Sequence, residues 1–278
     1  MSITVISPVL NEVDFIGYSI LATVKYVDEY IYILDEASND GTRELLQHIK
    51  KKYAGPKLVI GDCPTFNPLD MKDYNACFNI AIGCSHSQLI WFLHPDMIVT
   101  NPEKILELND DSLAWITDVT SYAGDLETQI VQGRVAKWKN IHANKFRLHY
   151  YGGYGSQNED FYHKDITGRT YKHYGQEFSK YPFQVSESGI QINHYCEVKN
   201  YKRRLEKMKL CIKTQYPDFD DLKIEEMAVQ HPRVTLEPSS TIFGKFEFAP
   251  AQAPVPEVFS KYKKEFEAFK KEPNLVEA

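Results

Sequence analysis

Over about its first 120 residues the chain alternates short apolar runs with stretches of helical periodicity, and this alternation limits the fold more than any other feature. Runs rich in β-branched and aromatic residues predict strands, and apolar side chains that recur every three to four residues between them predict helices. The predicted strands are residues 3–6, 30–34, 57–60, 89–93 and 113–117. Strands that alternate with helices build an α/β fold, in which a mostly parallel sheet is covered by helices on both faces.

Three of the predicted strands are followed directly by polar clusters. The clusters are residues 8–12, 35–42 and 94–96, and they supply carboxylates, amides and an imidazole. Ligands of open parallel sheets bind at the carboxyl ends of the strands. We therefore expect the three clusters to meet at one edge of the sheet and to form a binding site there.

After about residue 120 the pattern changes. Residues 191–194 resemble a last short strand, residues 201–212 have helical spacing, and a proline-rich connector at 249–256 leads to a final helix. We expect one main domain followed by a C-terminal helical appendage. The expected organisation is a nucleotide-binding half at 1–120 and a second half at 121–235, which together form the main domain 1–235, and a connector with a helix at 236–278.

Composition argues against several classes of protein. The net charge of −6, from 32 basic and 38 acidic residues, argues against a nucleic-acid-binding protein. The five cysteines are odd in number and include no C-x-x-C pair, which favours a reducing compartment over a disulfide framework. The first residues lack a signal-peptide pattern, and no run approaches the roughly 20 apolar residues that cross a bilayer. We expect a soluble, cytoplasmic protein without a transmembrane segment.

The turn after the first predicted strand excludes two common nucleotide-binding motifs. It reads S-P-V-L-N-E, whereas a dinucleotide-binding Rossmann domain requires G-x-G-x-x-G and a P-loop requires a glycine-rich loop ending in G-K-S or G-K-T. The segments TVISPVLNEVDFIGYSI, YIYILDEASNDGT and ACFNIAIGCSHSQLIWFLHPDMIV instead resemble, in order and in spacing, the motifs of GT-A glycosyltransferases of the family 2 type. The resemblance implies the GT-A fold, a Rossmann-like mixed sheet.

The resemblance implies a nucleoside diphosphate sugar as donor, with a UDP-sugar favoured, and a divalent cation, Mn²⁺ or Mg²⁺, that neutralises the leaving diphosphate. In the family the second acid of an Asp-x-Asp motif binds the metal, and here this residue is Asp96, with His94 in place of the first acid. A late histidine completes the metal site in some members, which implies His194. The other implied contacts to the nucleotide sugar are Pro8, Asn11, Glu12, Asp35, Asp40 and Asn79.

The resemblance further implies transfer with inversion, for which a carboxylate must take the proton from the attacking hydroxyl of the acceptor. Family members often supply this base from a Glu-Asp pair after the metal motif. Here that pair is Glu159-Asp160, and we expect Asp160 to be the base, with Glu159 and Asp165 as alternatives. The acceptor is a glycan or another molecule with a free hydroxyl group.

Each of these assignments has a plainer alternative that the sequence leaves open. His94-Pro95-Asp96 could be a strand-ending turn, and Asp40 could cap the next helix. His194 could be a packed core residue, Asp160 a surface acid, and the basic stretch 199–209 a solvated helix face. At the level of function, the alternatives are a sugar-nucleotide-binding protein that has lost catalysis, because His94 replaces an acid, and a transferase that acts on modified nucleic acid.

Overall fold

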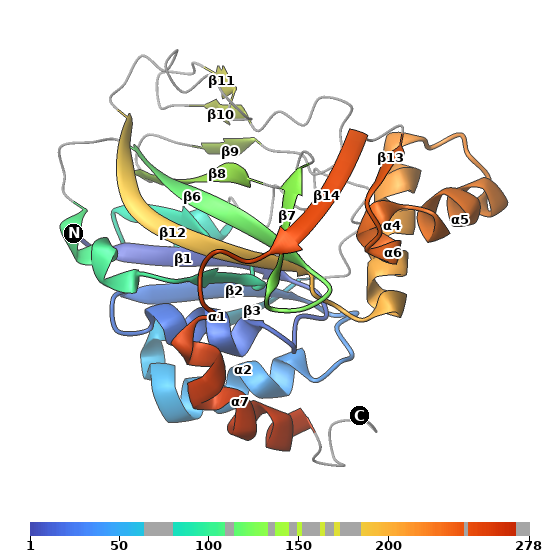
Figure 1. The fold of residues 1–278 in the computed structure, drawn as a ribbon. Helices are drawn as coiled ribbons and strands as arrows, with labels where there is room; N and C mark the ends of the chain where they lie inside the picture. The colour runs from blue at the N-terminus through green and yellow to red at the C-terminus, as the bar shows by residue number, and fades with distance from the viewer. Residues whose placement is uncertain are drawn as a thin grey trace.

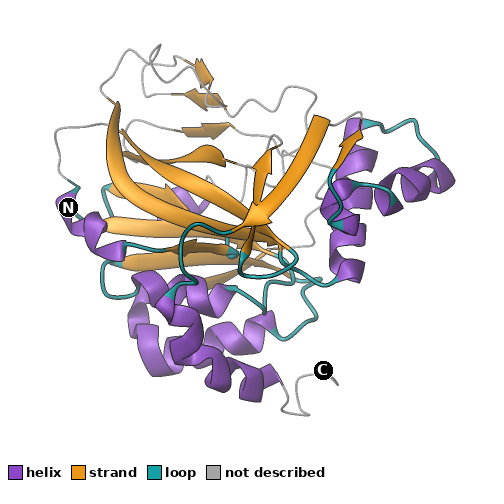
Figure 2. Cartoon of the chain, viewed as in Figure 1, coloured by secondary structure: helices purple, strands orange, loops and turns teal. Residues whose placement is uncertain are grey.

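The computed structural model is shown in Figures 1 and 2. It describes residues 1–63, 80–108, 114–132, 137–144, 149–151, 162–164, 170–172, 185–241 and 244–270. The chain has an α/β fold built on a sheet that is parallel in its first half and mixed in its second half, as the alternating pattern predicts.

The parallel part of the sheet has the strand order β3-β2-β1-β4. Its strands are β1 (Ile3–Val9), β2 (Glu29–Asp35), β3 (Leu58–Cys63) and β4 (Leu89–Phe92). Strand β1 is central, since it pairs in parallel with β2 on one side and with β4 on the other. The carboxyl ends of β1, β2 and β4 therefore lie at the same edge of the sheet.

Strand β1 runs three residues further than the sequence pattern indicates, through Pro8 to Val9. Its pairing with β4 ends at Ile6 opposite Phe92, while its pairing with β2 continues to Val9. A proline lacks the amide hydrogen and is tolerated where a strand has a neighbour on one side only. Pro8 lies in that part of β1, which explains why it does not end the strand.

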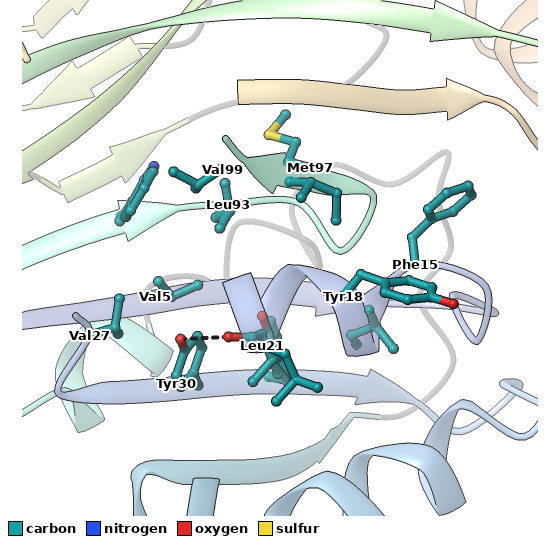
Figure 3. Close-up of a cluster of buried hydrophobic side chains, with 14 of the residues drawn as sticks. Val5, Phe15, Tyr18, Leu21, Val27, Tyr30, Leu93, Met97 and Val99 are labelled. Atoms are coloured by element: carbon teal, nitrogen blue, oxygen red, sulfur yellow. Dashed lines mark hydrogen bonds between the residues drawn. The ribbon is translucent and has the colours of Figure 1, made fainter. Parts of the chain in front are cut away.

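Helices cover the two faces of the parallel part. Helices α1 (Ile16–Thr23), α2 (Thr42–Ile49) and α7 (Glu257–Lys270) lie on one face, and the helical residues 80–84 pack on the other through Ala81. Side chains along a strand alternate between the faces. Accordingly Val5 and Tyr30 belong to the main core with α1, as Figure 3 shows. Ile6 and Ile31 lie in the second cluster with Ala81.

The second half of the chain extends the sheet. Strand β4 pairs with β8 (Lys137–Asn144), and β6 (Ala114–Ala123) follows in the order β4-β8-β6, both pairings being antiparallel. Strand β12 (Val185–Glu197) is far longer than the predicted 191–194, and it pairs in parallel with β6 and antiparallel with β5 (Met97–Val99). The polar turn 94–96 therefore connects two strands, and the β5 pairing brings β12 next to it.

The remaining elements are short or lie towards the C-terminus. Short helices follow α2 and β5 in the chain. The segment of the sequence between β8 and β12 contributes strands β9, β10 and β11, which form a small antiparallel sheet of their own. Helices α4, α5 and α6 pack together around Met208, Ile212 and Ile224. The bounds are η1 Lys50–Ala54, η2 Gly55–Lys57, η3 Pro102–Glu107, β7 Thr128–Gln132, β9 His149–Tyr151, β10 Tyr162–Lys164, β11 Thr170–Lys172, α4 Tyr201–Gln215, α5 Asp221–Val229, α6 Pro232–Thr235, β13 Ser239–Thr241 and β14 Gly244–Pro250.

The C-terminal part is joined closely to the rest of the chain. Strand β14 pairs with β7, and α7 buries Phe259 and Phe266 in the main core beside Tyr18 of α1. Phe266 lies so close to α1 that a Cβ atom at Gly17 would come within 2.7 Å of its ring. The boundary at residue 236 remains a prediction, but the residues after it add strands to the sheet as well as a helix. No helix among the described residues is both long and apolar enough to span a bilayer.

Replacing Phe266 with alanine should lower the free energy of unfolding by about 3–5 kcal/mol, because the large side chain is 2% exposed and its removal leaves a cavity between α7 and α1. Chemical denaturation measures the change. Leu222→Ala is the control, since Leu222 is 71% exposed. Equal effects of the two substitutions would show that α7 does not pack on the core in this way.

A polar clasp also holds α7. The carboxylate of Glu265 lies 2.6 Å from the hydroxyl of Tyr53, 2.8 Å from Nε2 of His48 and 2.9 Å from Nζ of Lys52. Burial alone would raise the pKa of Glu265, but the hydrogen bonds from His48, Tyr53 and Lys52 lower it to about 2. Because the carboxylate is partly exposed, the clasp contributes modestly to stability.

Glu265→Gln should reduce the free energy of unfolding at pH 7 by about 1 kcal/mol. The folded-state pKa is below the ordinary value of 4.5, so this stabilisation is complete above about pH 4.5 and is lost as the pH falls towards 2. Denaturation series of the two proteins from pH 7 to pH 2 should therefore converge. Glu267→Gln on the same helix is the control, and a difference independent of pH would contradict the assignment.

Candidate active site

The turns after β1 and β2 are joined by hydrogen bonds. The backbone nitrogen of Asn11 donates to Oγ of Ser38 at 2.9 Å, and the side-chain oxygen of Asn11 accepts from the backbone nitrogen of Asn39 at 2.9 Å. The backbone nitrogen of Glu12 donates to Oγ1 of Thr42 at 2.8 Å. Asn11 has φ 54°, in the left-handed region that asparagine tolerates better than most residues. These contacts hold the first two polar clusters against each other.

Two of the expected nucleotide contacts have structural hydrogen bonds in this region. Asp35 is fully buried at the end of β2, and its Oδ1 accepts from the backbone nitrogen of Ala37 at 2.7 Å. Asp40 accepts from the backbone nitrogen of Thr42 at 3.0 Å and from that of Val13 at 3.1 Å. Asp40 therefore joins the two turns next to the start of α2, although the N-cap position of that helix is occupied by Gly41 and not by Asp40. A role of either residue in ligand binding remains a prediction.

The third polar cluster meets β12. Asp96 is 5% exposed and His194 is 7% exposed, and His194 Nε2 lies 3.3 Å from Asp96 Oδ1. The backbone oxygen of Asp96 accepts a hydrogen bond of 2.9 Å from the nitrogen of Tyr195. Strand pairing places His194 opposite Met97, one residue after Asp96. The structure thus brings together two side chains that lie nearly 100 residues apart in the sequence.

His94 lies close to the same pair. Its ring centroid is 6.4 Å from that of His194, and the planes of the two rings are inclined by 30°. Burial lowers the pKa of His94 to about 4, so its imidazole is neutral at physiological pH. Burial would also lower the pKa of His194, but its interactions with Cys196 and with the paired carboxylate of Asp96 raise it to about 10. The two imidazoles therefore differ in charge although they are neighbours.

Lys199 completes the cluster, although the sequence allowed the basic stretch 199–209 to be a solvated helix face. Lys199 is 8% exposed, and its Nζ lies 2.6 Å from Oε1 of Glu12 and 3.4 Å from Oδ2 of Asp96. Burial raises the pKa of Glu12. Burial would also raise the pKa of Asp96, but the positive charges of Lys199 and His194 outweigh this effect and hold the pKa of Asp96 well below its usual range. Lys199 links the turn after β1 to the turn after β4.

Other basic side chains of the stretch 199–209 also point inward. Arg203 pairs with Asp40 and, at 3.2 Å, with Asp14, while Arg204 donates to the backbone oxygen of Val234. The ammonium of Lys207 is 3.8 Å from the buried carboxylate of Glu197. These pairs attach the start of α4 to the site and to β12. Sequence periodicity could not show this, because it does not reveal which charged side chains find partners far away in the chain.

The residues present fit a divalent cation of the Mn²⁺ or Mg²⁺ type. Carboxylate oxygen and imidazole nitrogen are suitable ligands, and the 3.3 Å between Asp96 Oδ1 and His194 Nε2 is close to the ~3 Å that separates neighbouring ligands of an octahedral ion. The Oε2 atom of Glu12 is buried and has no hydrogen-bond partner in the described part of the chain. No group of three His, Cys, Asp or Glu side chains is gathered as a metal centre among those residues.

The burial of Ser121 excludes a hydrolase site with a serine nucleophile. Oγ of Ser121 lies 3.5 Å from Nδ1 of His194, so Ser121, His194 and Asp96 follow one another as in a hydrolytic triad. The side chain of Ser121 is fully buried, however, and a nucleophile must reach its substrate. Ser121 is better explained as a hydrogen-bond partner that helps to orient the imidazole of His194.

Three residues expected at the site lie outside the described residues. Asn79 precedes the helical residues 80–84, and Glu159 and Asp160 fall between β9 and β10. Asp165, the alternative base, also lies outside the described part. Their roles stay predictions from the sequence.

Comparison with known proteins gives a distant likeness. The sequence matches no protein-family model and no curated protein. Among solved structures, the chain is similar to S. aureus TarS 1–349 in complex with UDP-GlcNAc, with 12% identity and a TM-score of 0.42 over 83% of this chain and 71% of that one. In another TarS 1–349 structure the match spans 47% of that chain.

Glucosyl-3-phosphoglycerate synthase from Mycobacterium tuberculosis is similar in two complexes. The complex with UDP has 12% identity and a TM-score of 0.39 over 93% of this chain and 91% of that one. The complex with Mn²⁺ and UDP-glucose has 14% identity and a TM-score of 0.37 over 79% and 80%. With TM-scores below 0.5, these likenesses do not assign an activity to this chain. The α/β fold rests on the strand order and the helices that cover the sheet.

Proposed function

We propose that the chain is a glycosyltransferase that moves a sugar from a nucleoside diphosphate sugar, preferably a UDP-sugar, to a hydroxyl group of an acceptor such as a glycan. The observation that carries this proposal is the meeting of Asp96, His194 and the Glu12 turn at the carboxyl ends of the parallel strands. Ligands of such sheets bind at this edge. The ordered motifs of the sequence support the same class of donor.

Asp96 and His194 are the residues that would hold a divalent cation, with His94 as a further candidate ligand. His194 would lose its ring proton on binding the cation, because only a neutral imidazole is a metal ligand. The cation would neutralise the charge that develops on the leaving diphosphate. The neutral imidazole of His94 is suited to a hydrogen bond with the ribose or a phosphate. Asn11, Asp35 and Asp40 shape the two turns on the β1 and β2 side, and Pro8 precedes them in β1. We place the nucleoside on this side.

Transfer with inversion requires a base on the acceptor side, and Asp160 is proposed for this step. Its carboxylate would accept the proton of the acceptor hydroxyl as the oxygen attacks the anomeric carbon, while the nucleoside diphosphate leaves from the opposite face. The negative charge that develops on the leaving nucleoside diphosphate would then lie beside Asp96, His194 and Lys199.

The geometry supports one of the two alternative functions and weakens the other. A protein that binds sugar nucleotides without catalysis is supported by His94, which places a neutral imidazole where the family has an acid. A transferase acting on nucleic acid would need exposed basic side chains. Lys199, Arg203 and Arg204 are instead engaged within the chain, which weakens that alternative.

Nucleotide binding should depend on Asp96. Titration with UDP and a panel of UDP-sugars, in the presence of Mn²⁺, should raise the melting temperature by about 5 °C or more at 100 times the dissociation constant. Asp96→Asn should remove the part of this shift that requires Mn²⁺, since the amide is a poorer ligand. Asp218→Asn, on an exposed loop residue, is the control. An unchanged Mn²⁺ response in Asp96→Asn would exclude the proposed metal site.

Asp160→Asn should leave the UDP-induced thermal shift unchanged and reduce transfer or hydrolysis of the UDP-sugar by at least about 100-fold, because proton abstraction is lost. Release of UDP with time measures the rate. Glu159→Gln is the matched control and should keep most of the activity. Full activity of Asp160→Asn would remove Asp160 as the base, and no turnover of any donor by the wild-type protein would favour the non-catalytic alternative.

A further inference from the structure

Lys199 occupies an unusual position for a lysine. It follows the end of β12 and precedes α4, and its side chain is buried between the turns after β1 and β4. Its ammonium lies 2.6 Å from Glu12 Oε1 and 3.4 Å from Asp96 Oδ2. Asp96 is also the residue best suited to bind a divalent cation here. One carboxylate is therefore shared between a cation that belongs to the chain and a cation that would come from solution.

The backbone holds Lys199 firmly in this place. Its own carbonyl oxygen accepts a hydrogen bond from the guanidinium of Arg204, which also bonds to the carbonyl oxygen of Val234. The next residue, Asn200, caps α4 by accepting a 3.0 Å hydrogen bond from the nitrogen of Arg203. The side chain is long and flexible, whereas its attachment point is fixed. The ammonium can change partners without movement of the backbone.

Electrostatics gives the ammonium two alternative sets of partners. A buried ammonium requires anionic neighbours, and in the free protein these are Glu12 and Asp96. A divalent cation at Asp96 would repel Lys199 at short range. A diphosphate bound at the same edge would offer the ammonium new anionic oxygens and so compensate for the loss of Asp96.

We propose that Lys199 couples metal binding to nucleotide binding: its ammonium competes with a divalent cation for Asp96 in the free protein and moves to the diphosphate when the nucleotide binds. Lys199 is thus a positioning residue that acts through Asp96. Coupling of this kind is reciprocal, so UDP tightens Mn²⁺ binding by the same factor by which Mn²⁺ tightens UDP binding. The role of the nucleotide rests on the proposed function, whereas the competition at Asp96 does not.

The test is to measure Mn²⁺ affinity, by titration calorimetry and by the loss of the free-ion signal in electron paramagnetic resonance, with and without UDP. Wild-type protein should bind Mn²⁺ weakly alone and about tenfold more tightly with UDP. Lys199→Met, which keeps most of the length of the side chain without its charge, should bind Mn²⁺ alone about tenfold more tightly than wild type. The further gain from UDP should then be smaller than in wild type, because only the direct attraction between Mn²⁺ and the diphosphate remains.

Lys202→Met is the matched control, because Lys202 is exposed on the first turn of α4 and should leave both affinities unchanged. If Lys199→Met does not fold, because Glu12 loses its partner, Glu12→Gln/Lys199→Met is compared with Glu12→Gln alone. The double variant should bind Mn²⁺ more tightly, since Asp96 no longer pairs with Lys199 and Glu12 leaves no buried charge without a partner.

The outcomes separate the two proposals. Mn²⁺ affinity in Lys199→Met equal to or weaker than in wild type overturns the competition at Asp96. Tighter Mn²⁺ binding by Lys199→Met in a protein that binds no nucleoside diphosphate supports the competition and overturns the proposed function. Equal gains from UDP in wild type and in Lys199→Met overturn the coupling.

Discussion

The candidate site depends on the position of β1 between β2 and β4. Parallel pairing on both sides brings the ends of three strands to one edge, and each end continues into a polar turn. The register lets β1 continue past the last β4 pair, so that its turn starts beside the turn after β2. The hydrogen bonds of Asn11, Glu12 and Asp40 then need no long loops, and the left-handed backbone in these turns is that of Asn11 and Gly41. Strand order thus gives the site its shape before any charge is considered.

Charge is balanced at this edge by residues from the second half of the chain. Glu12, Asp40 and Asp96 belong to the first half, and Lys199, Arg203 and His194 are their partners from β12 and α4. A buried carboxylate without such a partner would be costly. The long strand β12 therefore has two roles, since it closes the mixed sheet and carries the chain to the point where these cations begin.

The sequence predicts the first half of the fold well and the second half poorly, for a physical reason. Strands β1, β2 and β4 are largely apolar and buried runs that alternate with helical stretches, so their local pattern is strong. Strand β12 pairs with two strands and carries Asn193, His194 and Glu197 as buried polar residues, which hide its period. Strand β14 ends in a proline at 250 and is defined mainly by its pairing with β7.

In the candidate site, too, the sequence predicts some residues and not others. Residues at strand ends, such as Asp35 and Asp96, follow from position in the pattern, and His194 follows from resemblance to a family. Lys199 could not be identified in this way, because a basic residue before a helix has the same local sequence whether it faces solvent or two buried carboxylates. What decides between these is the burial of Glu12 and Asp96, which only the packed chain shows. A carboxylate expected to bind metal should therefore be considered together with the cations that the fold itself brings to it.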